Sequence, residues 1–182
     1  MDYRGAARHA IARDGGLFLL EGELFGEYAP GEEIARGEFP RDLPAGARLL
    51  PPVEPSKIVA IGLNYKDHAA EQHKPLPREP MVFLKPSTAV IASGEAIRLP
   101  SGIGRIDFES ELAVVIGRRA TKVPRERALD HVLGYTCAND VTARDLQRLG
   151  VQYSHCKGYD TFAPLGPCIA VGIDPGNLSI EG

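Results

Sequence analysis

Short apolar runs separated by glycine- and proline-rich stretches dominate the sequence, and they predict strands rather than long helices. Lys57–Gly62 is a continuous apolar run typical of a buried strand, and Met81–Pro86 is a second run that ends at a proline. Asp107–Gly117 and Val132–Val141 predict two further strands, and residues 163–182 are again strand-like with proline turns. With 20 glycines and 15 prolines in 182 residues, the pattern predicts a mainly β fold of the α+β class.

The predicted helices are short. Asn64–His73 has helical composition, and Arg125–Asp130 follows Pro124, which suits a first helical position. Thr142 starts a Ser/Thr-x-x-Asp/Glu pattern that we expect to cap a helix over Asp145–Leu149.

The first part of the chain predicts a small β domain of its own over residues 1–50, followed by a catalytic domain over residues 51–182. The stretches His9–Arg13 and Leu17–Leu20 flank Asp14-Gly15-Gly16, and Asp-Gly between extended segments is a hairpin signal. Prolines at positions 40, 44, 51 and 52 then punctuate the connection, which sets the predicted boundary.

Charge and composition exclude several classes of function. The net charge of −3 and a pI near 6.0 give no basic surface for nucleic acid or for an anionic membrane. No apolar run approaches the roughly 20 residues that span a bilayer, and the first residues lack the apolar core of a secretion signal. We therefore expect a cytoplasmic protein. The three cysteines are widely spaced and predict neither a disulfide framework nor a zinc site.

Two glutamates one residue apart in an apolar run are the strongest chemical signal. On a strand Glu109 and Glu111 point to the same face, where two carboxylates repel each other unless a cation lies between them. Asp140 ends another predicted strand and adds a third hard oxygen ligand, a set that suits Mg²⁺ or Mn²⁺. The alternative is that these side chains form the solvated face of a strand.

A histidine and a glutamate three residues apart give a candidate acid–base pair. His68 and Glu71 lie on one face of the predicted helix, where the carboxylate raises the basicity of the imidazole. A surface pair is the alternative interpretation, and His73 could take the place of His68. Lys157 lies in a segment poor in charge and could stabilise an enolate, or it is a solvated loop lysine. A His155–Cys156 dyad is rejected, because neighbours on a strand face opposite ways.

Taken together, the motifs resemble those of the fumarylacetoacetate hydrolase family, over roughly residues 55 to 182. Gly62–His68 is similar to its glycine-x-asparagine-tyrosine…histidine signature. Four further segments follow in the family's order: Phe83–Ser87, the metal-binding motifs Asp107–Leu112 and Asn139–Gln147, and the active-site lysine segment Lys157–Pro167.

The resemblance implies a rolled mixed β-sheet or barrel with short helices, usually in a homodimer. It implies that Glu109, Glu111 and Asp140 hold Mg²⁺ (or Mn²⁺) and that His68 with Glu71 is the acid–base dyad. The substrate contacts that it implies are Lys157, Gln147, Lys85 and Arg144. The first 50 residues resemble the β extension of bacterial members, and family members continue beyond Gly182, so we expect this chain to lack the C-terminal part.

The function that follows is a divalent-metal-dependent enzyme acting on a small-molecule 2-oxo acid. Isomerisation of a 2-hydroxyhepta-2,4-diene-1,7-dioate type intermediate of aromatic catabolism, with decarboxylation as a related outcome, is our first choice. Hydrolysis of acylpyruvates or fumarylpyruvate and decarboxylation of oxaloacetate are the enzymatic alternatives. An inactive, metal-binding structural relative or fragment is the alternative of another class.

Overall fold

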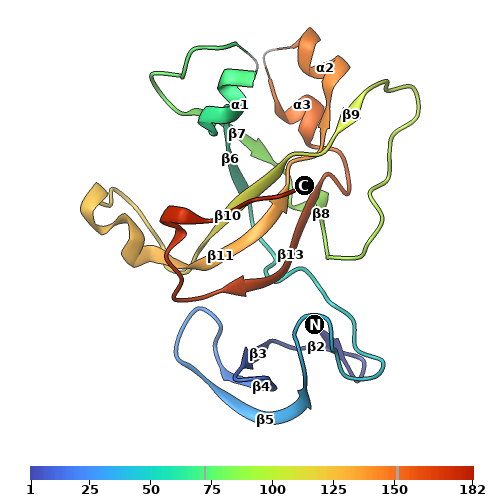
Figure 1. Cartoon of the computed structure of the whole chain (residues 1–182), viewed down its shortest axis with the longest axis vertical. Coiled ribbons are helices and arrows are strands. Elements are labelled where there is room, and N and C mark those ends of the chain that lie inside the picture. Colours follow the sequence, from blue (N-terminus) through green and yellow to red (C-terminus); the bar gives the residue numbers. More distant parts are fainter. Residues whose placement is uncertain (72, 151) are drawn as a thin grey trace.

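The fold is described from a computed structural model that covers residues 1–71, 73–150 and 152–182. Strands outnumber short helices, as the apolar pattern predicts (Figure 1). The strands of the first fifty residues are β1 (Asp2–Tyr3), β2 (Ala6–Ala7), β3 (Ala10–Arg13), β4 (Gly16–Gly22) and β5 (Tyr28–Arg36). The later strands are β6 (Ile58–Gly62), β7 (Met81–Lys85), β8 (Val90–Ile91), β9 (Ile106–Asp107), β10 (Ser110–Ile116), β11 (Val132–Asn139), β12 (Thr142–Ala143) and β13 (Ala163–Ala170). The helices are α1 (Lys66–Glu71), α2 (Arg144–Leu149), α3 (Ser154–Lys157) and the 3₁₀ helices η1 (Ser87–Ala89), η2 (Arg125–His131) and η3 (Pro175–Asn177).

The N-terminal strands form sheets among themselves. β3, β4 and β5 make an antiparallel sheet, and the β3–β4 hairpin turns at Asp14 and Gly15, whose φ angles of 51° and 72° match the turn predicted there. Figure 1 shows these strands at one end of the molecule, away from the helices. The domain boundary near residue 50 stays a prediction.

A four-stranded mixed sheet lies at the centre of the molecule, in the order β10-β11-β13-β8. β10, β11 and β13 are antiparallel neighbours, and β13 pairs with β8 in parallel. The sheet is open, with β10 and β8 at its edges, so in the described part of the chain it does not close into a barrel. β6 and β7, which precede and follow α1 in the sequence, form a separate antiparallel pair. β9 pairs with β12.

One cluster of buried core residues comes from the segments around β12, α3 and the start of β13. Val141, Ala143, Cys156 and Phe162 are almost completely buried against one another. Because these residues come from β12, α3 and their flanks, their burial fixes the segments that follow the end of β11.

The predicted strand Asp107–Gly117 is divided in the structure. β9 pairs with β12, whereas β10 pairs with β11, and the chain changes partner at Phe108 and Glu109. The Glu109 carbonyl still accepts a hydrogen bond from the Asp140 N–H at 2.9 Å, so the two segments stay adjacent across the change.

Two local predictions were wrong, and the strand predicted over residues 163–182 is confirmed only as far as Ala170. Thr142 does not cap α2, because it is buried in β12, where its hydroxyl donates to the Asp140 carbonyl at 2.8 Å. His155 and Cys156 lie on the helix α3, not on a strand. The dyad is nevertheless absent, because the Cys156 thiol is buried and donates to the Tyr153 carbonyl. After β13, the tail contains η3 and no strand within its described residues.

Candidate metal centre and active site

Three carboxylates meet at the end of the central sheet. Oxygen atoms of Glu109, Glu111 and Asp140 all lie within 4.8 Å of one another. Glu111 is in β10, Glu109 precedes that strand, and Asp140 follows β11; the register that pairs Ser110 with Asn139 therefore brings all three together. The Glu109 N–H also donates to the Asn139 side chain at 3.1 Å, which fixes the backbone at the point where the ladder changes partner.

Two buried lysines compensate these charges. Lys157 donates to Glu109 Oε2 at 2.7 Å and to the second oxygen of Asp140, while Lys85 donates to Asp140 Oδ1 at 2.5 Å. Lys85, Lys157 and Asp140 are each less than 5% exposed. Burial lowers the pKa of Lys85, and Asp140 offsets this only in part. Burial has the same effect at Lys157, but Asp140 and Glu109 outweigh it, so the pKa of that ammonium is raised.

Glu111 differs from its neighbours. Burial opposes ionisation of Glu109, but Lys157 and Arg144 outweigh it and lower the pKa of that carboxyl. Glu111 has no hydrogen-bond donor on its carboxylate among the residues that the structure describes. Burial, with the charges of Asp140 and Glu109, raises its pKa to about 7. It is the ligand candidate that protons compete for near neutral pH.

Arg144 lies against the outer side of Glu109. Its guanidinium donates to Glu109 Oε1 at 2.5 Å, to Asp107 Oδ2 at 2.8 Å and to Gln147 Oε1 at 2.9 Å. Hydrogen bonds from Arg105 and Arg144 lower the pKa of Asp107 to about 2. Sequence reasoning missed Asp107, although it shares the alternation of Glu109 and Glu111 and could have been found by it.

The acid–base candidates lie on α1. The His68 Nδ1 atom is 3.6 Å from Glu71 Oε2, which is an ion-pair distance rather than a hydrogen bond. Glu71 is exposed and His68 partly so. Tyr65, which the sequence analysis also missed, accepts a hydrogen bond from the Leu112 N–H at 2.9 Å and so ties the start of α1 to the edge of β10.

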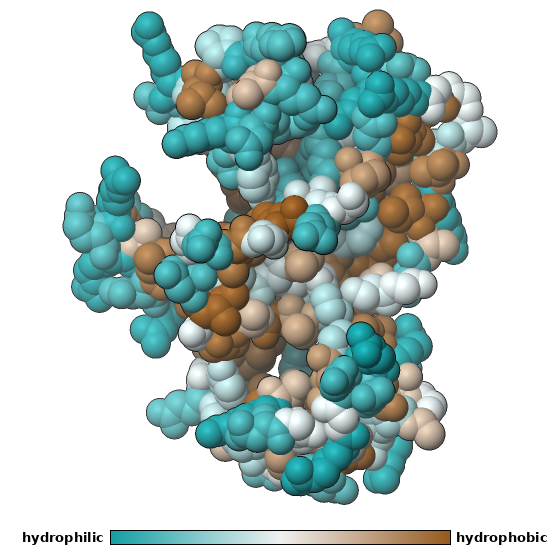
Figure 2. Space-filling model, viewed as in Figure 1, coloured by the Kyte–Doolittle hydropathy of each residue, from teal (hydrophilic) through white to brown (hydrophobic). Residues whose placement is uncertain are grey.

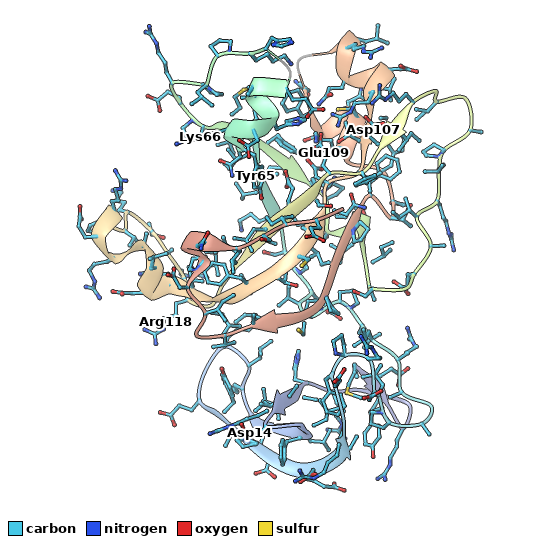
Figure 3. All side chains as sticks on the ribbon, viewed as in Figure 1. Asp14, Tyr65, Lys66, Asp107, Glu109 and Arg118 are labelled. Atoms are coloured by element: carbon cyan, nitrogen blue, oxygen red, sulfur yellow. The ribbon has the colours of Figure 1, made fainter. Side chains whose placement is uncertain are left out.

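All these elements border one cleft of about 1360 Å³. Figure 3 labels Tyr65, Asp107 and Glu109 where α1, β9 and β10 approach one another above the central sheet. The cleft is lined by eight of the nine predicted site residues: His68, Glu71, Glu109, Glu111, Asp140, Arg144, Gln147 and Lys157. Lys85 is not part of the lining, since it is buried behind Asp140.

The donor set fits a hard divalent cation. Oxygens on opposite sides of Mg²⁺ lie about 4.2 Å apart, close to the spread of the Glu109, Glu111 and Asp140 oxygens. Each carboxylate oxygen keeps a second lone pair when it accepts a hydrogen bond from lysine or arginine. The three carboxylates could therefore bind Mg²⁺ or Mn²⁺, whereas an all-oxygen set is a poor match for zinc.

Comparison with known proteins identifies the family. The family model for fumarylacetoacetate (FAA) hydrolase, C-terminal, matches residues 57–181. The chain belongs to the fumarylacetoacetate hydrolase family. The resemblance seen in the motifs is thereby confirmed, together with the mainly β fold and its mixed sheet. No helix in the described part of this family member is long and apolar enough to cross a membrane.

Solved structures of two isomerases are similar to this chain. The 5-carboxymethyl-2-hydroxymuconate delta-isomerase of Mycobacterium smegmatis is 37% identical with a TM-score of 0.75, over 92% of this chain and 63% of that protein. The 2-hydroxyhepta-2,4-diene-1,7-dioate isomerase of Mycobacterium marinum is 39% identical with a TM-score of 0.65, over 92% of this chain and 66% of that protein.

A curated relative that is named for a different activity is also similar. The mitochondrial oxaloacetate tautomerase of Xenopus laevis is 44% identical over 138 residues, which are 73% of this chain and 43% of that protein. This chain thus spans less than two thirds of the length of these three proteins.

Proposed function

We propose that this chain carries the active site of a divalent-metal-dependent enzyme that moves a proton on an enolisable 2-oxo acid. The reaction that we favour is isomerisation of a 2-hydroxyhepta-2,4-diene-1,7-dioate type substrate. One observation carries the proposal: the cleft that holds the three carboxylates also holds His68, Glu71 and Lys157.

In this proposal Glu109, Glu111 and Asp140 are the protein ligands of Mg²⁺ or Mn²⁺. An ion held there would supply Lewis-acid stabilisation of the negative charge that develops on an enolised 2-oxo acid. Lys85 would hold Asp140 in place from behind, because its ammonium is buried and bonded to that carboxylate.

His68 would transfer the proton, and Glu71 would orient the imidazole and raise its basicity. For isomerisation of a 2-hydroxydienoate, the imidazole would take the proton of the 2-hydroxyl group, which becomes the 2-oxo group, and would deliver a proton to the far carbon of the diene, so no proton is gained or lost overall. Lys157 would donate to a substrate oxygen on which negative charge develops, and Gln147 would position the substrate.

The three relatives described above favour proton transfer as the proposed chemistry. Two of those described above are isomerases and one is a tautomerase, and both reaction types relocate a proton on an unsaturated or 2-oxo acid. Hydrolysis of acylpyruvates and decarboxylation of oxaloacetate share the same enolate and are the alternatives. A metal-binding relative without turnover is the alternative of another class.

Deuterium exchange tests the step that the reactions have in common. The chain with Mg²⁺ is incubated in D₂O with one substrate at a time: pyruvate, oxaloacetate, an acylpyruvate or a dienoate diacid. Proton NMR follows the loss of signal from the hydrogens on the carbon next to the 2-oxo group. We expect catalysed exchange that EDTA abolishes. New ultraviolet bands, cleavage products or CO₂ then distinguish isomerisation, hydrolysis and decarboxylation. No catalysed exchange on any substrate, with Mg²⁺ binding intact, would favour the inactive relative.

We also propose a homodimer. Apolar residues gather across the middle of the molecular surface, over β10, β11 and β13 (Figure 2). Phe108, Val114 and Ile116 are each about half exposed or more, and a surface of this kind is typical of an interface. Light scattering at micromolar concentration tests the proposal, and a monomer mass would contradict it.

A further inference from the structure

Arg144 uses all three of its guanidinium nitrogens on protein acceptors. Nη2 donates to Glu109, Nε to Asp107 and Nη1 to Gln147, and the side chain is only 15% exposed. A guanidinium held at three points has a fixed plane, which lysine or glutamine cannot reproduce. The carboxylate that it binds is therefore held in one orientation.

The backbone and side-chain contacts around Arg144 also hold it in place. β9 and β12 pair Asp107 with Thr142, and the Arg144 N–H donates to the Arg105 carbonyl at 2.8 Å. The Arg105 side chain contacts both oxygens of Asp107 at 2.9 and 3.1 Å. Asp107 is thus fixed on one side by Arg105, and on the other side it fixes Arg144.

Glu109 receives its orientation from this arrangement. Arg144 donates to Oε1 at 2.5 Å, while Oε2 accepts a hydrogen bond from Lys157 at 2.7 Å. Without Arg144 the Glu109 side chain would be free to rotate away, because the one side-chain hydrogen bond left to it among the described residues is that from Lys157.

We infer that Asp107 and Arg144 are positioning residues that orient Glu109 for the metal. This inference rests on the proposed metal centre, and it moves Arg144 from the substrate to the support of a ligand. Residues behind metal ligands typically change metal affinity by about 10- to 100-fold when they are replaced.

Charge and orientation make opposite predictions for one substitution. Arg144→Gln removes a positive charge beside the centre, so electrostatics alone would make cation binding tighter. If Arg144 orients Glu109, the same substitution makes binding weaker. Arg144→Lys keeps the charge without the fork, so a purely electrostatic role leaves affinity unchanged and a positioning role lowers it.

The experiment is a Mn²⁺ titration of the purified chain, followed by electron paramagnetic resonance of the free ion without any substrate. We expect affinity to fall by about tenfold in Arg144→Gln, Arg144→Lys and Asp107→Asn. Arg118→Gln is the matched control, because Arg118 is exposed and lies outside the cleft lining (Figure 3), and we expect less than about a twofold change. The double variant Asp107→Asn/Arg144→Gln should lose no more than Arg144→Gln alone, because Asp107 acts through Arg144.

Unchanged or tighter Mn²⁺ binding in Arg144→Gln and Arg144→Lys overturns the inference, as do additive losses in the double variant. Circular dichroism in EDTA confirms that each variant compared is folded. If the unsubstituted chain binds no Mn²⁺, the metal centre itself fails. If it binds Mn²⁺ but catalyses no exchange, only the proposed reaction fails and the positioning roles still stand.

Discussion

Lys85 and Lys157 bind opposite oxygens of one buried carboxylate, that of Asp140. Lys157 also reaches Glu109, so its ammonium lies among the oxygens that are candidates to bind a divalent ion. Three carboxylates and the cations around them, Lys85, Lys157 and Arg144, nearly balance one another without a metal. A bound divalent ion would bring an excess of positive charge, which suits an acidic substrate.

Replacing Lys157 should separate metal binding from catalysis. In Lys157→Met the carboxylates lose a buried cation, so we expect Mg²⁺ affinity to rise by about tenfold or more. Without metal the variant should lose about 3 kcal/mol of stability, because buried charges are left unpaired. Turnover should be lost. Calorimetric Mg²⁺ titration and thermal melts with and without EDTA measure these effects.

Lys66→Met is the control for that substitution, because Lys66 is an exposed lysine on α1. It should change neither affinity nor melting temperature. Weaker Mg²⁺ binding in Lys157→Met would mean that the ammonium helps to build the site and does not compete with the ion.

Removing a carboxylate ligand should have the opposite effect. Glu109→Gln should weaken Mg²⁺ binding by at least about tenfold and abolish activity, because a neutral amide is a poor ligand for a hard cation. Mg²⁺ at 100 times its Kd should stabilise the unsubstituted chain by about 2.7 kcal/mol, and this gain should shrink in the variant. Glu126→Gln, an exposed carboxylate on η2, is the control. Unchanged calorimetry in Glu109→Gln would reject the ligand assignment.

The raised pKa of Glu111 predicts how metal binding responds to pH. Protons compete with the ion for this carboxylate below its pKa of about 7, so Mg²⁺ affinity should fall by about tenfold per pH unit there. Above pH 7 the affinity should level off. Calorimetric titrations at steps of about half a pH unit, from about pH 5.5 to about pH 8.5, measure the profile. A flat profile would contradict the assigned environment of Glu111.

The same group predicts the stability of the metal-free chain. The pKa of Glu111 rises on folding from its ordinary value of 4.5 to about 7, so the folded state binds this proton more tightly. Its stabilising contribution is complete below about pH 4.5 and is lost as the pH rises through about 7. Melting temperatures in EDTA should therefore fall over this range, and Glu111→Gln should remove that part of the fall.

The periodicity of the sequence predicted the central strands because their apolar runs are long and continuous. It also predicted that Glu109 and Glu111 share a face, since two-residue alternation survives the break between β9 and β10. The break itself could not be predicted, because it depends on β9 pairing with β12, a contact between distant segments.

The cap assigned to Thr142 failed for a related reason. A Ser/Thr-x-x-Asp/Glu pattern records local preference, but burial of the Thr142 hydroxyl between Asp140 and Lys157 overrides it. The sequence alone left Lys157 open to two interpretations, a catalytic residue or a solvated loop lysine. The packing of α3 against the core shows that this lysine is buried.

His68 is the residue whose loss should leave the metal centre intact but stop proton transfer. It lines the cleft on α1, next to Glu71, and it contributes no atom to the carboxylate cluster. His68→Ala should therefore keep its Mg²⁺ affinity while deuterium exchange falls by about 10²- to 10⁴-fold. His73→Ala is the matched control, because His73 lies beyond the end of α1 and outside the cleft lining, and it should exchange normally. Full exchange in His68→Ala, with loss in His73→Ala, would move the base to His73.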